Sequence, residues 1–132
     1  MLESMTHERT GLAILLWAVD PEQPERCATP FFHAATAAAM DLHVEVYFSS
    51  RSVQLLQLGV AEKLRTIEQG GETIAHFMRE AHRAGVRFLA CSSSVQGLLP
   101  YGCKLIAEVD GFAGAGTFVA RTIDPAWATL VF

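Results

Sequence analysis

Short apolar runs alternate along the chain with longer segments whose apolar residues recur every three or four positions. Residues 11–19 are apolar throughout, as expected of a central parallel strand that is covered on both faces. In residues 43–49, apolar and polar side chains alternate, which predicts a second strand nearer the sheet edge than the first. Three further runs complete a prediction of five strands: 86–90, 104–110 and 128–132.

Helical periodicity is clearest in residues 72–84, where apolar residues recur at intervals of three and four from Ile74 to Ala81 and so share one face. Thr29 is expected to cap another helix, because Pro30 suits a first helical position. Weaker patterns predict three short helices, the first capped by Ser50, and a surface loop with one helical turn: 51–58, 92–99 and 113–123 for the helices, and 60–71 for the loop.

Helices separate the predicted strands and no hairpin signal joins them, which indicates an α/β protein with three α/β/α layers and a mostly parallel sheet of about five strands. The 132 residues fit one domain, 11–132, after an N-terminal tail, 1–10, that we expect to be flexible. Ligands of such folds bind beyond the carboxyl ends of the strands. The loops expected there are 20–29, 49–52, 91–94 and 110–113.

Composition narrows the classes of partner. Apolar residues make up 51% of the chain and charged residues only 18%, which favours a surface partly covered by another subunit. A net charge of −4 with only two lysines gives no basic surface for nucleic acid. The longest apolar run, 12–19, is far shorter than the ~20 residues of a membrane-spanning helix, so no membrane partner is expected.

Cys91 is the strongest candidate for chemistry, because it lies where the third strand passes into a short helix. Backbone N–H groups of Ser93 and Ser94 are free at such a helix start, and they are expected to stabilise a thiolate whose ordinary pKa is ~8.5. The alternative is that the thiol is only a small buried apolar group. The three cysteines are odd in number and lack CxxC spacing, which indicates a reducing, cytoplasmic compartment.

Other candidate residues are weaker. Cys27 follows the first strand and is expected at the same sheet edge as Cys91, where it is either incidental or one half of a dithiol redox couple. Cys103 is expected to be structural. His33 is the histidine best placed for a general base, but histidine spacing gives no metal site, and no cofactor is expected. The glycines of residues 111–116 are interpreted as close packing of a helix on the sheet, not as a dinucleotide motif.

Several segments taken in order resemble the DsrE/DsrF-like family, which includes the Tus-type sulfur-relay subunits. The resemblance extends from Leu12 to Phe132 and depends on the order of its segments more than on any one motif. It rests on the apolar first strand, the Ala-rich helix, Val-Glu-Val-Tyr-Phe, Arg-Ser-Val-Gln-Leu-Leu, Ala-His-Arg-Ala-Gly-Val-Arg-Phe-Leu-Ala-Cys, and Gly-Thr-Phe-Val-Ala-Arg-Thr-Ile followed by Ala-Thr-Leu-Val-Phe.

The resemblance implies a sulfurtransferase-type sulfur carrier, in which Cys91 accepts sulfane sulfur as a persulfide and passes it to a partner protein. It also implies sulfur donor and acceptor proteins as partners and assembly into a homo-oligomer, whether dimer, trimer or hexamer. This chain departs from the family in having no basic residue close behind Cys91. Two alternatives stay open: a noncatalytic binding or scaffolding subunit of the same fold, and a dithiol redox protein.

Overall fold

The computed structural model describes residues 8–67 and 71–132. Within these ranges five strands form one sheet, and all four strand pairings are parallel. The strands are β1 (Gly11–Leu16), β2 (His43–Phe48), β3 (Arg87–Ala90), β4 (Val109–Phe112) and β5 (Trp127–Val131). The α-helices are α1 (Thr29–Ala39), α2 (Ile74–Arg83), α3 (Ser92–Leu98) and α4 (Ala115–Thr122). Three short 3-10 helices are η2 (Pro24–Arg26), η3 (Ser50–Leu56) and η4 (Ala61–Lys63).

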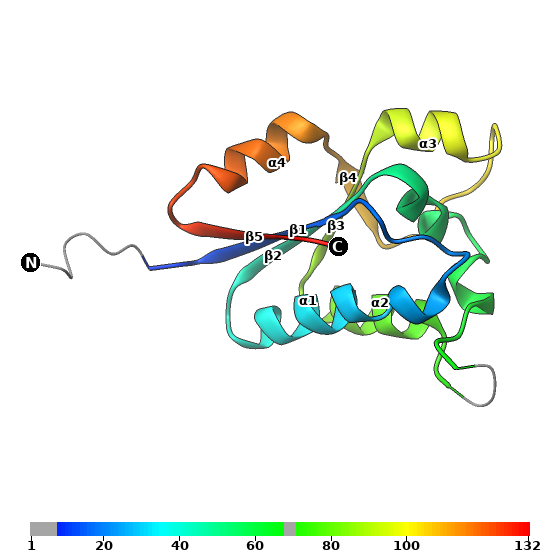
Figure 1. Cartoon of the computed structure of the whole chain (residues 1–132), viewed down its shortest axis with the longest axis horizontal. Helices are drawn as coiled ribbons and strands as arrows, with labels where there is room; N and C mark the ends of the chain where they lie inside the picture. Colours follow the sequence, from blue (N-terminus) through cyan, green and yellow to red (C-terminus); the bar gives the residue numbers. More distant parts are fainter. Residues whose placement is uncertain (1–7, 68–70) are drawn as a thin grey trace, which may run out of the picture.

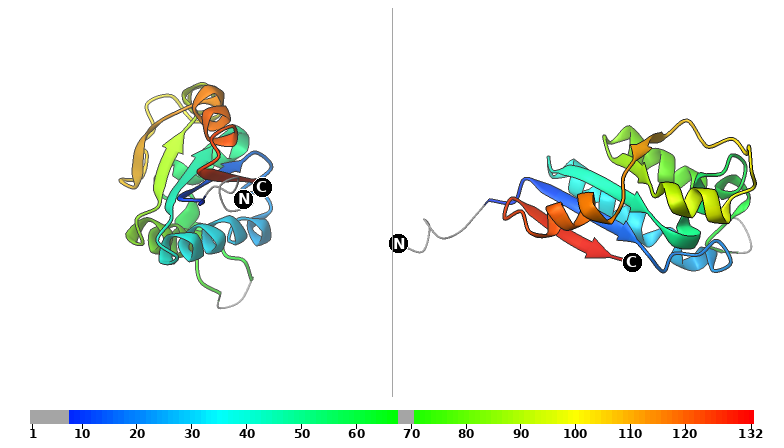
Figure 2. Two further views of the ribbon diagram at one scale, coloured as in Figure 1. Left: turned by 90° about the vertical axis from the view of Figure 1, so that its left-hand side faces the viewer. Right: turned by 90° about the horizontal axis from the view of Figure 1, so that it is seen from above.

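The helices cover the sheet on both faces, as the sequence predicts. Helices α1 and α2 lie side by side under one face, whereas α3 and α4 lie over the other (Figures 1 and 2). The strand order β4-β3-β2-β1-β5 puts β2 in the middle of the sheet. The prediction that the second strand lies nearer the edge than the first is therefore wrong. Its polar residue Glu45 is buried as fully as its apolar ones, because partners inside the protein balance its charge.

The two faces of the sheet differ in how much core they bury. Between the sheet and α1, the rings of Phe31, Phe48 and Phe88 contact one another with centroids 5.2–6.0 Å apart. The core beneath α4 is much smaller and centres on Tyr47 and Phe118. The α4 face is thus the thinly packed side of the protein.

Two of the strands differ from the prediction by more than one residue at an end. The first strand ends at Leu16, not at residue 19, because the chain bends at Trp17. The fourth strand occupies Val109–Phe112, not residues 104–110. The backbone at 104–106 bonds to the end of η3 instead, where Leu58 N–H donates to the Lys104 carbonyl and Ile106 N–H donates to the Leu56 carbonyl. Those bonds hold this segment away from the sheet.

Helix ends also correct the sequence interpretation. Ala28, not Thr29, is the capping residue of α1, and the structure shows no side-chain cap there. Residues 51–58 form no α-helix, because the segment winds as the 3-10 helix η3 from Ser50. Helix α2 is capped by Thr73, whose hydroxyl oxygen accepts the His76 N–H.

The remaining predictions concern loops and termini. The expected helical turn in residues 60–71 is η4, although residues 68–70 of that loop lie outside the described ranges, as do residues 1–7 of the predicted tail. The glycine interpretation is wrong for Gly114 and Gly116, since a methyl group on either would meet nothing within 4 Å. None of the helices in the described ranges has both the length and the apolar character needed to cross a membrane.

Candidate functional site

Four residues that directly follow strands lie in a row at the carboxyl edge of the sheet. The strand register aligns the last residues of β1, β2, β3 and β4. The next residues continue this alignment, because Ser49 N–H donates to the Leu16 carbonyl, Cys91 N–H to the Phe48 carbonyl and Ala113 N–H to the Ala90 carbonyl. The row therefore reads Ala113, Cys91, Ser49, Trp17 from one side of the sheet to the other. Of the four loops expected at this edge, those at 49–52, 91–94 and 110–113 contribute to it.

A cavity of about 340 Å³ lies between this row and helix α4. All four residues of the row line it. Its other walls come from strands β1 and β2 beneath and from the first two turns of α4 above, through Leu15, Tyr47, Phe118 and Val119 among others. Trp17 is 67% exposed and Val119 53%, so the cavity opens to solvent beside them. We call it the Cys91 cavity.

The thiol of Cys91 is partly exposed and is held among hydroxyl groups. Its Sγ lies 3.4 Å from the Ser93 Oγ. Hydrogen bonds from the Ser93 hydroxyl first, then from the Ser94 hydroxyl and the backbone N–H groups of the same serines, lower the Cys91 pKa from 9.0 to about 7, against a smaller opposing effect of burial. A large fraction of Cys91 is therefore the nucleophilic thiolate at neutral pH.

The serines were expected from the sequence, but their hydroxyl groups matter more than the backbone groups invoked there. The Ser94 Oγ also accepts the backbone N–H of Ser50 at 3.0 Å. Because that bond uses a lone pair, the Ser94 hydroxyl hydrogen remains free to point at the thiolate. Ser50, which has a positive φ of 53°, thus joins the start of η3 to the start of α3. No local sequence pattern predicts this contact.

The structure does not bring Cys27 to the Cys91 cavity. Cys27 is fully buried in the core on the α1 side, and its Sγ–H donates to the Asp20 carbonyl at 3.4 Å. Burial, reinforced by the carboxylates of Asp20 and Glu25, raises the Cys27 pKa to about 11. The third cysteine, Cys103, is partly buried and packs against the core. Both thiols have the environment of packing residues.

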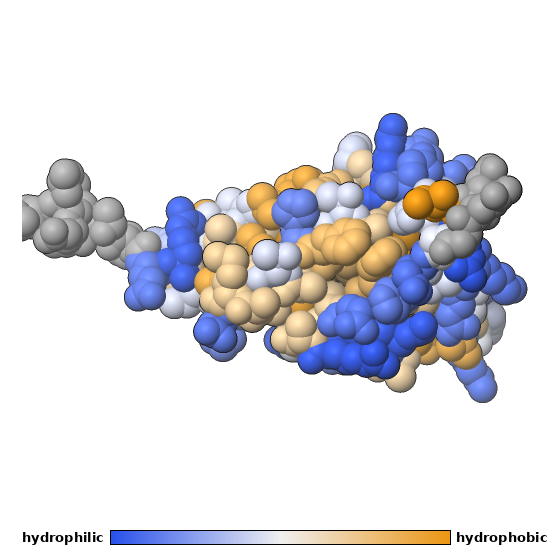
Figure 3. All heavy atoms as spheres, turned by 90° about the horizontal axis from the view of Figure 1, so that it is seen from below, coloured by the Kyte–Doolittle hydropathy of each residue, from blue (hydrophilic) through white to orange (hydrophobic). Residues whose placement is uncertain are grey.

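His33 lies on the opposite side of the sheet from the Cys91 cavity. It belongs to α1, where its Nδ1–H donates to the Thr29 carbonyl at 2.9 Å and its ring meets the edge of Phe132. Figure 3 views the face formed by α1 and α2, on which apolar side chains gather between polar ones. Phe32 is 54% exposed there and Met40 68%. Because α1 covers the face of the sheet opposite the Cys91 cavity, His33 has no access to the Cys91 thiol.

Glu45 is a buried charged residue that the sequence analysis missed. Only 4% exposed, it accepts a hydrogen bond from the Tyr47 hydroxyl at 2.8 Å and two from the Arg121 guanidinium at 2.9 Å each. Burial alone would raise the Glu45 pKa, but the bonds from Arg121 and Tyr47 outweigh it and hold the pKa below 4.5. The Arg121 guanidinium also stacks 3.9 Å from the Trp127 ring centre. These contacts fix the last turn of α4 to the sheet, and so fix one wall of the Cys91 cavity.

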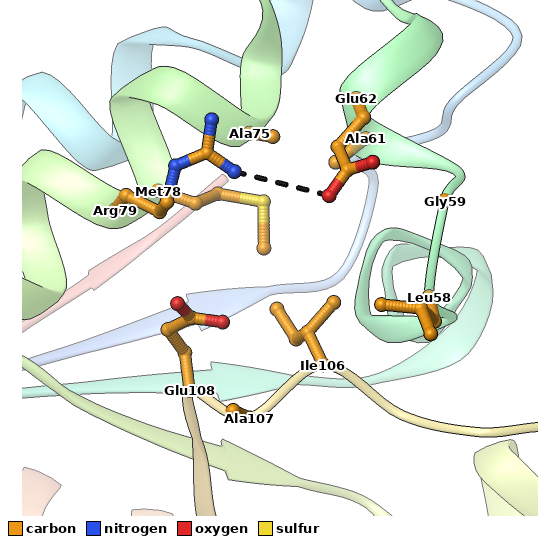
Figure 4. Close-up of a pocket in the computed structure, with 10 residues that line it drawn as sticks. All are labelled: Leu58, Gly59, Ala61, Glu62, Ala75, Met78, Arg79, Ile106, Ala107 and Glu108. Carbon is orange, nitrogen blue, oxygen red and sulfur yellow. Dashed lines mark ion pairs between the residues drawn. The ribbon is translucent and has the colours of Figure 1, made fainter.

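A second, smaller cavity of about 190 Å³ lies between α2, η4 and the segment before β4 (Figure 4). Met78 and Ile106 line it, and the Arg79 guanidinium lies 3.9 Å from the Glu62 carboxylate, another lining residue. It shares no lining residue with the Cys91 cavity and contains no cysteine or histidine. Across residues 8–67 and 71–132, no group of three His, Cys, Asp or Glu side chains is arranged to hold a metal ion.

Comparison with known proteins decides the family. A model described as the DsrE/DsrF-like family matches residues 13–99, a segment that includes Cys91 and both serines beside it. The chain belongs to the DsrE/DsrF-like family. Members of this family are associated with sulfur relay. No similar sequence was found among curated proteins.

Two solved structures share the fold of this DsrE/DsrF-like chain. The ychN protein from E. coli superposes with a TM-score of 0.67 at 16% identity, covering 92% of this chain and 99% of its own. MTH1491 from Methanobacterium thermoautotrophicum, described as a protein of unknown function, gives a TM-score of 0.67 at 19% identity, covering 96% and 100%. Both therefore cover more of the chain than the family match does.

Proposed function

We propose that this protein is a sulfur carrier that accepts sulfane sulfur as a persulfide on Cys91 and passes it to a partner protein. The observation that carries the proposal is the partly exposed Cys91 thiol, which lines a cavity and whose pKa is lowered to about 7 by Ser93 and Ser94. Membership of a family associated with sulfur relay supports it independently.

The proposed loading step needs one nucleophile and no cofactor. The Cys91 thiolate attacks the outer, sulfane sulfur of a donor persulfide, R–S–SH. A bond forms between the Cys91 Sγ and that sulfur, while the donor S–S bond breaks and its electron pair leaves with R–S⁻. The product is Cys91–S–SH. Delivery repeats the same exchange with Cys91 as the leaving group, and a leaving thiol of low pKa departs faster.

The few polar groups beside the Cys91 thiol are sufficient for a sulfur carrier of this kind. The hydroxyls of Ser93 and Ser94 stabilise negative charge on sulfur, which benefits both the attacking thiolate and the departing one. The geometry lends no support to the dithiol alternative, because Cys27 is buried on the other side of the sheet with a pKa raised to about 11.

Partners and location belong to the same proposal. A carrier needs a donor protein and an acceptor protein, and homo-oligomer assembly is supported by the exposed Phe32 and Met40 on the α1 face. A cytoplasmic location is supported by three unpaired cysteines, which a reducing compartment preserves. Light scattering of the purified protein measures the assembly: a mass above the 14.4 kDa of one chain is expected.

The proposal is tested by incubating the protein with a persulfide donor and measuring the mass of each cysteine-containing peptide. We expect one added sulfur atom on the Cys91 peptide, no loading in Cys91→Ser, and unchanged loading in the matched variant Cys103→Ser. An unmodified Cys91 under conditions that load an established carrier would overturn the proposal.

A further inference from the structure

We propose that, besides a donor protein, the Cys91 cavity accepts small-molecule sulfur donors whose carbon skeleton is uncharged and apolar, such as an alkyl or aryl persulfide. This inference rests on the proposed function and names the substrate class that the same site takes. It concerns the organic group R of a persulfide R–S–SH. The cavity is shaped to hold this group while Cys91 reacts with the sulfur.

The walls of the cavity supply no charge. Apart from the reacting Cys91, its lining consists of aliphatic, aromatic, hydroxyl and glycine residues, with no Asp, Glu, Lys, Arg or His. Its phenol, Tyr47, stays neutral, because burial and the neighbouring Glu45 carboxylate raise its pKa to about 12. A carboxylate or sulfonate placed inside would lose water without gaining an oppositely charged partner.

The hydroxyl groups in the lining are already committed to the protein. Tyr47 donates its hydroxyl hydrogen to Glu45 at 2.8 Å, and Ser49 donates its own to the Leu16 carbonyl at 2.9 Å. Each hydroxyl has a single hydrogen to donate. Neither side chain therefore has a donor left for a polar group of a substrate, whereas an apolar group needs none.

The size of the cavity suits a small organic group. A dry apolar cavity of ~150 Å³ accepts benzene, and typical ligand pockets begin at ~300 Å³. The Cys91 cavity has about 340 Å³ with Cys91 in its lining, so a ring or short alkyl chain fits beside the thiol. In the loading step the outer sulfur of R–S–SH bonds to the Cys91 Sγ, and R–S⁻ leaves with the electron pair of the broken S–S bond.

The test compares two thiol-reactive methanethiosulfonates that differ in the organic group bound to the reacting sulfur. Benzyl methanethiosulfonate presents an uncharged ring, and (2-sulfonatoethyl) methanethiosulfonate presents an anion. In both, the Cys91 thiolate attacks the sulfenyl sulfur, an S–S bond forms, and methanesulfinate leaves with the electron pair. Rates are measured from the mass of the Cys91 peptide at a pH where Cys91 is fully ionised. The ratio of the benzyl rate to the sulfonate rate is then divided by the same ratio measured for the free thiol 2-mercaptoethanol.

We expect the normalised ratio to favour the benzyl reagent by at least about tenfold, which corresponds to 1.4 kcal/mol. A matched pair of variants locates the preference. Ala115 and Ala120 are both exposed residues of α4, but only Ala115 lines the cavity. Ala115→Lys, which places a cation in the lining, should lower the benzyl rate, raise the sulfonate rate and so move the ratio toward that of the free thiol, while Ala120→Lys should leave it unchanged.

A normalised ratio near one in the wild-type protein would overturn the inference, as would equal effects of the two lysine variants. Either result leaves the carrier proposal standing, because these reagents report preference and not sulfur transfer. Failure of Cys91 to load from any persulfide donor would overturn the carrier proposal instead, and the two failures are thus separate measurements.

Discussion

Replacing Ser93 by alanine should raise the Cys91 pKa and change how fast the thiol reacts at each pH. The Ser93 hydroxyl is the largest contributor to the lowered pKa, and its Oγ lies 3.4 Å from the Cys91 Sγ. Ser93 is exposed, so its truncation removes a hydrogen bond without opening a cavity in the core. Ser94 remains in Ser93→Ala, and so part of the stabilisation of the thiolate is retained.

The full shift sets the upper limit of the effect. With a pKa of about 7, half of Cys91 is thiolate at pH 7, whereas at the unshifted value of 9.0 only about one molecule in a hundred is. That is about fifty-fold in thiolate, but a thiolate of higher pKa is more nucleophilic by roughly eightfold over two units. At pH 7 the net loss of rate is therefore at most about sixfold. Well above pH 9 the order reverses, and Ser93→Ala should react faster than the wild type.

The assay is the rate of alkylation by iodoacetamide as a function of pH, followed on the Cys91 peptide. The expected signature is a pair of crossing pH–rate curves, with Ser93→Ala slower at pH 7 and faster at high pH. Ser92→Ala is the matched control, because Ser92 is exposed in the same turn and does not contribute to the shift. Coincident curves for Ser93→Ala and wild type, or equal shifts in both variants, would show that the Ser93 hydroxyl does not lower the Cys91 pKa.

Two further predictions concern the stability of the fold. Arg121→Ala leaves the buried Glu45 carboxylate without its two guanidinium bonds and should lower the free energy of unfolding in urea by about 2 kcal/mol, whereas Arg83→Ala, which breaks an exposed pair, should cost less than about 1 kcal/mol. Gly11→Ala should cost about 1–3 kcal/mol in the same assay, since a Cβ at residue 11 would overlap the Trp127 ring across the β1–β5 pairing.

Two controls separate these specific losses of stability from a nonspecific effect of mutation. The Glu45 pKa is lowered in the folded state, so its stabilising effect is present above 4.5 and is lost as the pH falls below that value. The difference between Arg121→Ala and wild type should therefore shrink at acid pH, and a constant difference would contradict the ion-pair explanation. Gly114→Ala should be within about 0.5 kcal/mol of wild type, because a Cβ there meets nothing within 4 Å.

The layered fold and the position of Cys91 follow from local patterns that a sequence shows directly. Apolar runs between helical segments require parallel strands, and a cysteine directly after such a run must lie at the carboxyl edge. The predicted strand 86–90 and helix 92–99 accordingly differ from β3 and α3 by one residue each. Strand 104–110 was misplaced, because the bonds of Lys104 and Ile106 to η3 are tertiary contacts that no local pattern shows.

The cavity itself could not be predicted from the sequence, because its walls come from residues as far apart in the sequence as Leu15 and Phe118. One signal was available: residues 45 and 47 of a strand share a face, so Glu45 and Tyr47 had to lie together. Their partner Arg121 is 76 residues from Glu45, and nothing in the sequence identifies it. His33 and Cys27 were wrongly expected near Cys91 for a related reason. A loop or helix that follows a strand begins at the carboxyl edge of the sheet, but it can then run along the face opposite the cavity.

Transfer of sulfur through Cys91 can be measured by following isotopically labelled sulfur from a donor to an acceptor. The protein is loaded from a persulfide donor carrying heavy-isotope sulfur, separated from the donor, and mixed with an acceptor thiol. If the protein is a sulfur carrier, the labelled sulfur leaves the Cys91 peptide and appears on the acceptor in equal amount. Label found on Cys27 or Cys103, or label that stays on Cys91 when the acceptor is present, would contradict it.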